Sequence, residues 1–288
     1  MAEQALKQTI PVQAKPILKW AGGKTQMLGD LIPKVPTSYG RYIEPFFGGG
    51  AMFFALQPEN AVIADSNPEL INMYRQVADH VDEVINYLKK YENTSEMFYA
   101  VRSLEWTALP KAEAAARTIF LNKTCFNGLY RVNKQGQFNV PFGKYKNPKI
   151  CDEETLRADS ALLQRVEILC GDFAQTGRYA GENVLYYFDP PYRPLTETAA
   201  FTSYSKGGFD DAEQKRLRDF CDQIAAMRSL FVASNSDPQN VDNDDDFFDH
   251  LYRMFNIKRV SAARMINSKG DRRGAISEIM ISNVANAY

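Results

Sequence analysis

The chain has 288 residues, of which 45% are hydrophobic and 24% are charged, and its formal net charge is −1. This length and apolar content allow a full hydrophobic core and exclude an intrinsically disordered chain. The four widely spaced cysteines and two histidines predict no metal site and no histidine-dependent hydrolase. The apolar runs are far shorter than the roughly 20 residues that span a bilayer, so we expect a soluble protein of the cytoplasm.

The first part of the chain predicts a strand, a glycine turn, a helix and a second strand. The strand at residues 42–46 precedes the glycine triplet 48–50, and the strand at 61–64 ends at Asp65, 17 residues beyond the first of these glycines. In doubly wound sheets, such glycines let a ligand approach the backbone, and such an acid accepts hydrogen bonds from ribose hydroxyls. This segment therefore predicts the nucleoside-binding half of an α/β fold.

The next segment predicts an insert into that fold. Residues 69–91 and 95–123 have apolar positions at helical spacing, and residues 126–145 contain the turn signals and the strand-like triplet of a hairpin or extended loop. Residues 114–151 include seven Lys and Arg and no Asp or Glu, a pattern that favours phosphate binding, with ordinary solvated charge as an equal alternative. We interpret residues 69–155 as an inserted, mostly helical domain.

The α/β pattern resumes after the insert, so we expect residues 1–68 and 156–288 to form one domain. Polar residues that follow apolar strands, such as Asp189 and Ser234, are expected at the carboxyl edge of a sheet, where these folds bind ligands. The aspartate-rich segment 237–249 lacks the glycine of a calcium loop and is predicted to be solvated. Strands are predicted at residues 166–169, 184–188, 230–233 and 276–281 and near Val260.

The most specific motif is Asp189-Pro190-Pro191-Tyr192, which directly follows an apolar strand. The prolines fix φ and supply no N–H, so the carbonyl of Pro190 is free in a rigid turn. Asp189 and that carbonyl can each accept a hydrogen bond from one hydrogen of an exocyclic amine, and Tyr192 offers a flat face for an extruded base. A Pro-Pro turn without a catalytic role is the alternative.

Four motifs, taken in order, resemble those of the Dam-like DNA adenine methyltransferases, and the similarity extends from about residue 16 to residue 283. The resemblance implies a Rossmann-like methyltransferase sheet with an inserted target-recognition domain. It also implies transfer of a methyl group from S-adenosylmethionine to N6 of an adenine flipped out of double-stranded DNA, in a site that begins with G-A and is expected to be G-A-T-C. The motifs are Lys19-Trp20-Ala21-Gly22-Gly23-Lys24, Glu44-Pro45-Phe46-Phe47-Gly48-Gly49-Gly50, Asp65-Ser66-Asn67 and Asp189-Pro190-Pro191-Tyr192.

The resemblance assigns the catalytic role to the last of these motifs and a cofactor role to most of the others. Trp20 and Lys24 match positions at the methionine end of the cofactor, and Asp65 matches the ribose-binding acid. Asp172 matches the position that contacts the cofactor's adenine, with a helix cap or turn acid as the alternative. The residues implied to bind the cofactor are Trp20, Ala21, Gly22, Lys24, Phe46, Phe47, Gly48, Gly49, Gly50, Asp65, Asp172, Phe173 and Asp189.

Residues 126–145 resemble the target-recognition segment of the same family. Arg131 matches the position that reads a guanine through O6 and N7, and Phe126 matches an aromatic side chain that inserts into the duplex. Hydrophobic packing is the alternative for the aromatic residues. The residues implied to bind DNA are Lys19, Phe126, Asn127, Arg131, Asn133, Pro141 and Tyr145. Four polar residues nearer the C-terminus are expected to contact phosphates, with ordinary surface charge as the alternative: Arg264, Ser268, Arg272 and Arg273.

The same residues allow other interpretations. Lys24 follows two glycines but lacks the spacing of a phosphate loop, and the glycine triplet lacks the Gly-x-Gly-x-x-Gly form of a dehydrogenase. N4-cytosine methylation, a catalytically silent DNA-binding module and methylation of RNA or protein are alternatives that use the same fold. We further expect a monomer that associates with the nucleoid through DNA, and a cognate restriction endonuclease that acts on the same site is an open possibility.

Overall fold

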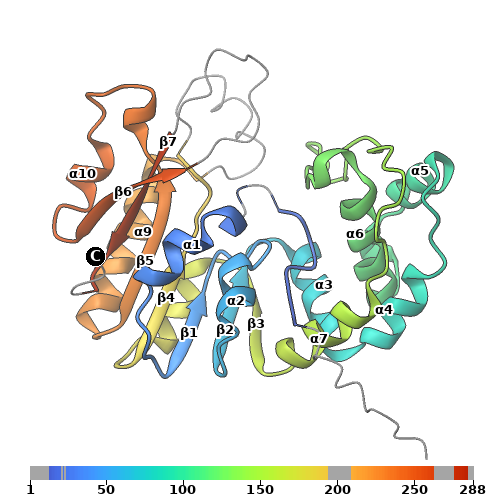
Figure 1. Cartoon of the computed structure of the whole chain (residues 1–288), viewed down its shortest axis with the longest axis horizontal. Coiled ribbons are helices and arrows are strands. Elements are labelled where there is room, and N and C mark those ends of the chain that lie inside the picture. Colours follow the sequence, from blue (N-terminus) through green and yellow to red (C-terminus); the bar gives the residue numbers. More distant parts are fainter. Residues whose placement is uncertain (1–12, 21, 23, 194–208, 263–275, 285–288) are drawn as a thin grey trace, which may run out of the picture.

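The computed structural model describes residues 13–20, 22, 24–193, 209–262 and 276–284. Their strands form a seven-stranded sheet in the order β3-β2-β1-β4-β5-β7-β6 (Figure 1). Strands β1 to β5 are parallel to their neighbours in this group, and β7 is antiparallel to both β5 and β6. The strands are β1 Arg41–Glu44, β2 Ala61–Asp65, β3 Val166–Cys170, β4 Val184–Phe188, β5 Leu230–Ser236, β6 Asn256–Ala262 and β7 Ile276–Ser282.

The helices complete the α/β fold that the sequence predicted, with two departures. The segment predicted as one helix at 69–91 is divided at His80, and the segment at 95–123 is divided before Pro110. Proline disfavours helical backbone at the residue before it, so Leu109 is extended. The α-helices are α1 Leu28–Leu31, α2 Ala51–Leu56, α3 Pro68–Asp79, α4 Val81–Leu88, α5 Ser95–Ser103, α6 Lys111–Thr124, α7 Glu153–Leu163, α9 Asp211–Ala226 and α10 Phe247–Leu251. Among the described helices, none is long and apolar enough to cross a membrane.

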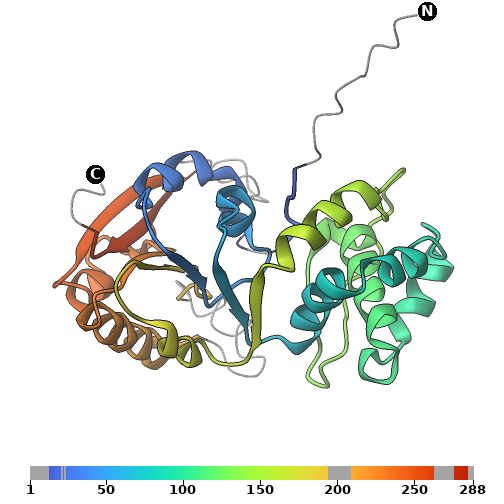
Figure 2. The ribbon, with the colours of Figure 1, turned by 90° about the horizontal axis from the view of Figure 1, so that it is seen from below.

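Strand β4 shows how one sheet builds two cores. All five of its residues are buried, and side chains along a strand alternate between the two faces of the sheet. Leu185 and Tyr187 pack into the hydrophobic cluster that includes α2 and α3, whereas Tyr186 and Phe188 pack into the cluster that includes α9. A strand covered on both faces therefore reads as a continuous apolar run. Figure 2 shows α1 and α2 in blue on one side of the sheet and α9 in brown on the other.

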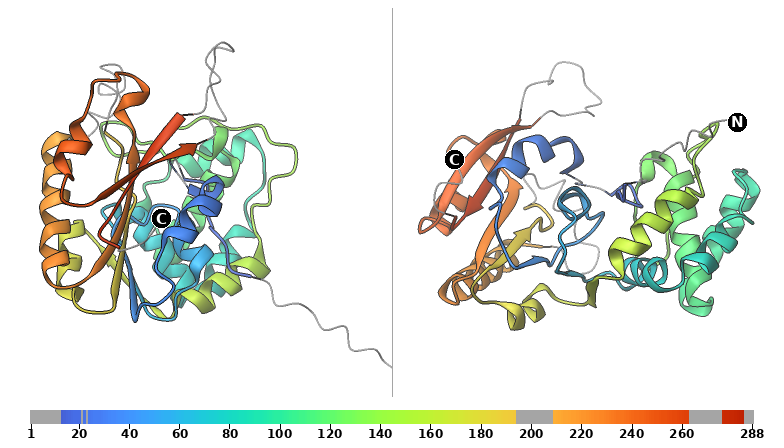
Figure 3. Two further views of the ribbon diagram at one scale, coloured as in Figure 1. Left: turned by 60° about the vertical axis from the view of Figure 1, so that its left-hand side comes forward. Right: turned by 60° about the horizontal axis from the view of Figure 1, so that its bottom comes forward.

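A second group of helices lies beside the β3 edge of the sheet (Figure 3). It comes from the described chain between β2 and β3, which supplies α3 to α7 and contributes no strand to the sheet. Helix α7 packs on α3 and α4, and α6 packs on α3 to α5. The division into a target-recognition domain of residues 69–155 and a catalytic domain of residues 1–68 and 156–288 stays a prediction.

The segment predicted as a hairpin or extended loop, residues 126–145, is called the basic hairpin below. It is held by isolated antiparallel bridges from Cys125 to Phe142 and from Val132 to Phe138. Asn133 closes the turn, because its side-chain oxygen accepts hydrogen bonds from two backbone N–H groups at 3.0 Å. The predicted hairpin is therefore confirmed, although it adds no strand to the described sheet.

The aspartate-rich segment 237–249 is only in part the solvated loop that the sequence predicted, since Asp242, Asp244 and Asp246 are exposed but the other acids are not. Asp237 is fully buried and accepts hydrogen bonds from Arg259 and Ser277. Asp245 pairs with Arg193 at 2.7 Å. A buried charge requires such partners because it has lost its hydration. Asp237 and Asp245 therefore anchor Arg259 of β6 and Arg193, the residue that follows the Asp-Pro-Pro-Tyr motif.

Candidate active site

A cavity of about 1080 Å³ opens where β1, β2 and β4 end. Strand ends of a parallel sheet meet at one edge, so motifs that are far apart in the sequence converge there. Ala21, which the sequence analysis assigned to the cofactor, lies outside the described residues. The other residues predicted to be catalytic or to bind the cofactor all line this cavity: Trp20, Gly22, Lys24, Phe46, Phe47, Gly48, Gly49, Gly50, Asp65, Asp172, Phe173, Asp189, Pro190, Pro191 and Tyr192.

The glycine turn after β1 gives Trp20 a place to pack. Gly48 has a left-handed φ of 48°, and a Cβ there would lie 2.7 Å from Cδ1 of Trp20. A Cβ on Gly49 would lie 2.9 Å from the Cβ of Trp20. Any larger side chain would therefore displace the indole or strain the backbone. The glycine motif and the tryptophan motif depend on each other sterically, although Gly48 lies 28 residues beyond Trp20 in the chain.

Asp65, at the end of β2, fixes the same turn. Its Oδ2 accepts a hydrogen bond from the N–H of Gly48 at 2.9 Å, and its Oδ1 accepts one from the N–H of Asn67 at 2.8 Å. Burial raises the pKa of Asp65, and these backbone donors oppose that shift. Each carboxylate oxygen has a second lone pair, so Asp65 can hold the turn and still accept from a ligand hydroxyl.

Aromatic rings form one wall of the cavity. Phe46 lies 5.2 Å from Phe173 and 5.4 Å from Phe209 between ring centroids, and the second contact is edge-to-face. The guanidinium of Arg216 covers Phe173 at 4.2 Å from the ring centroid. Such a wall suits a flat, apolar group such as a purine. Phe209 and Arg216 were missed by the sequence analysis because no local motif marks either residue.

Asp172 lies at the edge of this wall and is already paired. Arg216 donates two hydrogen bonds to its carboxylate, at 2.9 and 2.6 Å, and this pairing lowers the pKa of Asp172. Asp172 also accepts from the N–H of Ala174 at 2.9 Å and so caps the short helix η5, Phe173–Tyr179. The structure thus has the cap that the sequence analysis kept as the alternative for this residue. Contact of Asp172 with the cofactor's adenine stays a prediction.

The Asp-Pro-Pro-Tyr motif meets a buried lysine that lines the cavity. Lys24 is 4% exposed, and its Nζ lies 3.1 Å from Oδ1 of Asp189 and 3.5 Å from Oε2 of Glu278. The same amine hydrogen-bonds to the hydroxyl of Tyr192, and the Tyr192 hydroxyl donates to Glu278 at 2.7 Å. Ser234, in the second half of β5, donates to Oδ1 of Asp189 at 3.0 Å. Lys24 and Ser234 therefore hold the Asp189 carboxylate in place, and Tyr192 and Glu278 in turn hold Lys24.

The charges of this cluster shape the ionisation of Asp189. Burial raises the pKa of Asp189, and the nearby Lys24 and Ser234 lower it. A second carboxyl, Glu44, is buried in the cavity wall, and burial raises its pKa well above the ordinary value. Tyr42 donates to Glu44 at 2.7 Å. Neither Glu278 nor Glu44 was among the predicted site residues. Glu278 lies within a strand, and Glu44 was noted only as part of the glycine motif.

The residues predicted to bind DNA come together around the basic hairpin. Phe126 is 51% exposed, which contradicts hydrophobic packing as its role, whereas Phe142 packs on Phe98 at 5.3 Å. Arg131 is exposed, and its Nε donates to Oδ1 of Asn139 at 2.7 Å. The rest lie as follows: Lys19 over the Tyr145 ring at 5.6 Å, Asn127 exposed with a φ of 57°, Pro141 with its carbonyl accepting from the N–H of Phe126, and Asn133 in the turn.

The second predicted DNA-contact group lies outside the described residues. It consists of Arg264, Ser268, Arg272 and Arg273.

Comparison with known proteins decides the family. Residues 20–266 match the family model described as D12 class N6 adenine-specific DNA methyltransferase. The chain belongs to this family. The match covers the glycine turn and the Asp-Pro-Pro-Tyr motif, which line the enzyme's cavity, and the basic hairpin, which does not. Membership in an adenine-specific class sets aside the alternatives of cytosine, RNA or protein methylation.

Several curated relatives resemble this methyltransferase along nearly their full length. The type II methyltransferase M.MjaIII of Methanocaldococcus jannaschii is 44% identical, over 94% of this chain and 100% of that protein. The type II methyltransferase M1.LlaDCHI of Lactococcus lactis subsp. cremoris is 40% identical, over 98% and 99%. The DNA adenine methylase of Haemophilus influenzae is 32% identical, over 96% of each. The enzyme is therefore a DNA adenine methyltransferase of the Dam-like group.

Proposed function

We propose that this enzyme transfers the methyl group of S-adenosylmethionine to N6 of an adenine flipped out of double-stranded DNA, in a site that begins with G-A and is G-A-T-C in full. The observation that carries the proposal is the position of Asp189. Its carboxylate lines the cavity next to Pro190, while Lys24 and Ser234 both contact Oδ1. Among the described contacts, Oδ2 is therefore the oxygen left to accept from a substrate amine.

The cavity fits S-adenosylmethionine in size and in chemistry. Its volume of about 1080 Å³ is at the upper end of the range for ligand sites. The wall of Phe46, Phe173 and Phe209 suits the adenine, Asp65 suits the ribose, and the carboxylate of Asp189 suits a ligand that carries positive charge. When bound, the cofactor supplies an electrophilic methyl group on a positively charged sulfur. The chain supplies orientation and exclusion of water.

The chain's own residues prepare the amine for methylation. Oδ2 of Asp189 and the carbonyl of Pro190 each accept one N6 hydrogen, which keeps the amine's lone pair on nitrogen rather than in the purine ring. The ionised Asp189 also stabilises the positive charge that develops on N6 as the new bond forms. Lys24 favours that ionised form, because its ammonium lies 3.1 Å from Oδ1. The proton that N6 loses passes to the Asp189 carboxylate, which accepts the other end of that N–H hydrogen bond.

The basic hairpin supplies the contacts that offset extrusion of the base. Removing a base from the duplex costs a few kcal/mol, and protein contacts must compensate for this. The exposed ring of Phe126 can fill the space in the stack, and Arg131 can donate two hydrogen bonds to the neighbouring guanine. These two side chains support the G-A part of the proposed site. The G-A-T-C extension is supported only by the likeness of the hairpin to that of Dam-like enzymes.

The test of this function is a map of the modified bases. Unmethylated plasmid is incubated with purified protein and S-adenosylmethionine and then sequenced with base-modification detection. We expect N6-methyladenine at G-A-T-C and none with Asp189→Ala. Modification of cytosine alone, or full activity of Asp189→Ala, would contradict the proposal. Methylation of adenine at G-A within another sequence would support the proposed reaction but show that the recognition sequence is not G-A-T-C.

Partners and location follow from the same proposal. Two similar proteins are named type II methyltransferases, and we extend the proposal to a cognate restriction endonuclease that cuts the same site. Protection of modified plasmid against an endonuclease of that specificity tests this extension. We also propose that the enzyme acts as a monomer on the DNA of the nucleoid. Light scattering of the enzyme bound to a one-site duplex tests the monomer, and a mass of two protein chains per duplex would contradict it.

A further inference from the structure

The indole of Trp20 is the point where the cavity meets the basic hairpin. One side of the ring packs against the backbone of Gly48 and Gly49, where added Cβ atoms would lie 2.7 and 2.9 Å from Trp20 atoms. The ring also stacks on Tyr130 of the hairpin, with centroids 5.1 Å apart and planes at 26°. Trp20 lines the cavity, so a ligand there contacts one residue of a continuous stack that ends in the hairpin.

Tyr130 is also fixed at its hydroxyl end. The hydroxyl donates to Oε2 of Glu69 at 2.7 Å, and Glu69 is buried. The other oxygen of Glu69 accepts from Arg117 at 2.7 Å and from Thr118 at 3.0 Å, both on α6. A buried ion pair with this many partners is rigid, because breaking one contact leaves an uncompensated charge. Tyr130 therefore connects the indole to the body of the helical group through one stacked ring and one hydrogen bond.

The residue after Tyr130 is Arg131, the proposed reader of guanine. Neighbouring side chains of an extended segment point in opposite directions, so Tyr130 faces inward while Arg131 is exposed. Phe138, on the returning arm of the hairpin, contacts the Tyr130 ring edge-on at 5.9 Å between centroids. A shift of the Tyr130 ring would thus displace both arms of the hairpin and the guanidinium beside it.

We propose that Tyr130 is a positioning residue that couples occupancy of the cofactor cavity to DNA recognition by the basic hairpin. A cofactor that contacts Trp20 restricts the indole, the indole restricts Tyr130, and the hairpin then binds DNA with less loss of conformational freedom. By linkage, DNA strengthens cofactor binding by the same factor. The proposal rests on the proposed function, since it takes the cofactor and the DNA from it.

The coupling is measured by binding and needs no turnover. Fluorescence anisotropy gives the Kd of a labelled G-A-T-C duplex with and without S-adenosylhomocysteine, the demethylated product. We expect the ligand to tighten DNA binding about fivefold or more in the natural enzyme. Tyr130→Leu removes the stacked ring and should bring the ratio of the two Kd values, without and with S-adenosylhomocysteine, close to one. Tyr130→Phe keeps the ring and loses only the bond to Glu69, so it should restore most of the coupling.

A matched control is Tyr99→Leu. Tyr99 lies on α5 in the same helical group, is exposed, and packs on Phe98 rather than on Trp20. Its replacement should leave the ratio unchanged. A ratio near one in the natural enzyme, or an unchanged ratio in Tyr130→Leu, would overturn the proposal.

A second readout does not depend on the folding of Tyr130→Leu. The chain has two tryptophans, Trp20 and Trp106, so Trp106→Phe isolates the emission of Trp20. We expect addition of the duplex alone to change that emission, because the hairpin contacts the indole through Tyr130. An emission that does not respond to the duplex would overturn the coupling. Failure of the natural enzyme to methylate adenine would instead overturn the proposed function, and the two failures are therefore distinguishable.

Discussion

The ammonium of Lys24 lies 3.1 Å from Oδ1 of Asp189 and 3.5 Å from Oε2 of Glu278, so one buried cation serves two acids. Lys24 lowers the pKa of Asp189, whereas the negative charge of Glu278 raises it. The proposed chemistry needs Asp189 in its ionised form. The acid limb of the pH–rate profile therefore reports the ionisation of Asp189. Replacement of Lys24 and replacement of Glu278 should move that limb in opposite directions.

Replacement of Lys24 by glutamine should move the acid limb to higher pH. The pKa of Asp189 is already raised by burial, and loss of the neighbouring ammonium raises it further, so more alkaline solution is needed to ionise the carboxyl. The measurement is kcat against pH, with cofactor and DNA saturating, by transfer of a radiolabelled methyl group. Lys90→Gln, which changes an exposed lysine far from the cavity, is the matched control. An unmoved limb in Lys24→Gln would contradict the role of this lysine.

Replacement of Glu278 by glutamine should move the same limb to lower pH. Glutamine can still accept the hydrogen bond that the Tyr192 hydroxyl donates at 2.7 Å, but it removes the charge that raises the pKa of Asp189. The same kcat profile measures the shift. A displacement toward higher pH would mean that Glu278 acts mainly by holding Lys24 or Tyr192 in place, and the electrostatic account of this residue would be wrong.

Asp159 on α7 should make the protein less stable as the pH rises. It is fully buried, its Oδ1 accepts from the N–H of Lys15 at 2.9 Å, and burial raises its pKa to about 7. Its Oδ2 has no hydrogen-bond partner among the described residues. Between its ordinary pKa and 7, the folded chain holds a proton that the unfolded chain releases. The free energy of unfolding therefore falls as the pH rises through this window.

Asp159→Asn removes the fall in the free energy of unfolding that Asp159 causes as the pH rises. The variant should exceed the natural enzyme in free energy of unfolding by at most about 4 kcal/mol above pH 7, and by less at pH 5. Urea unfolding at pH 5 and pH 8 measures both values. Asp82→Asn, at an exposed acid that pairs with Arg157, is the control and should change stability by less than about 1 kcal/mol. A difference that does not grow with pH would refute the assignment to Asp159.

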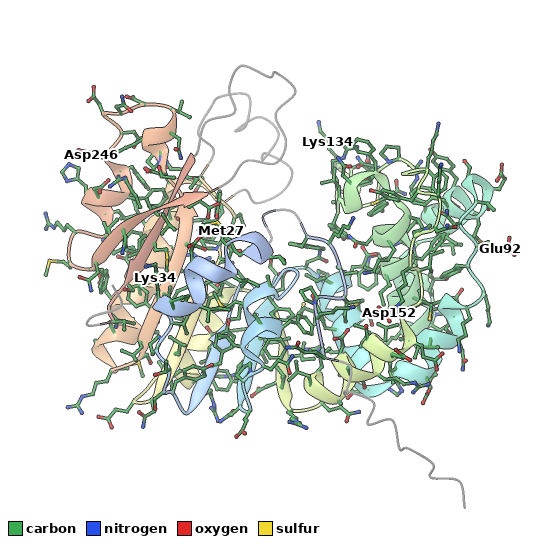
Figure 4. All side chains as sticks on the ribbon, viewed as in Figure 1. Met27, Lys34, Glu92, Lys134, Asp152 and Asp246 are labelled. Atoms are coloured by element: carbon green, nitrogen blue, oxygen red, sulfur yellow. The ribbon has the colours of Figure 1, made fainter. Side chains whose placement is uncertain are left out.

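Arg131→Ala should relax sequence preference at the guanine beside the target adenine. The loss of two hydrogen bonds to the base corresponds to roughly 1 to 3 kcal/mol of discrimination. The measurement is kcat/KM on duplexes with the site intact and with that guanine replaced. Lys134→Ala is the control, because Lys134 lies at the end of the same hairpin (Figure 4) and should weaken all duplexes alike. An unchanged preference in Arg131→Ala would remove this arginine from recognition.

The strand ends of the site could be predicted from the sequence. Asp65 and Asp189 each follow a short apolar run, and the carboxyl ends of parallel strands meet at one edge. The position of such residues needs only the strand boundaries and the parallel topology. The glycine triplet was predictable in the same way, because a turn between a strand and a helix requires left-handed backbone at Gly48 and Gly50.

The partners of these residues could not be predicted in this way. Glu278 comes from the antiparallel strand β7 and reaches Lys24 from more than 250 residues away in the chain. Arg216 and Phe209 reach the cavity from α9 and the residues before it. Their contacts depend on the order of the strands and on how α9 packs against the sheet. The stack of Trp20 on Tyr130 depends on where the helical group lies, which no local pattern determines.

The central claim is that Asp189 and the Pro190 carbonyl hold the amine of an extruded adenine. A crystal structure of the enzyme with a G-A-T-C duplex and S-adenosylhomocysteine tests it most directly. We predict that N6 of the target adenine lies within about 3.2 Å of both an Asp189 oxygen and the Pro190 carbonyl oxygen. An adenine that remains stacked in the duplex, or one that enters the cavity with its amine away from Asp189, would contradict the account.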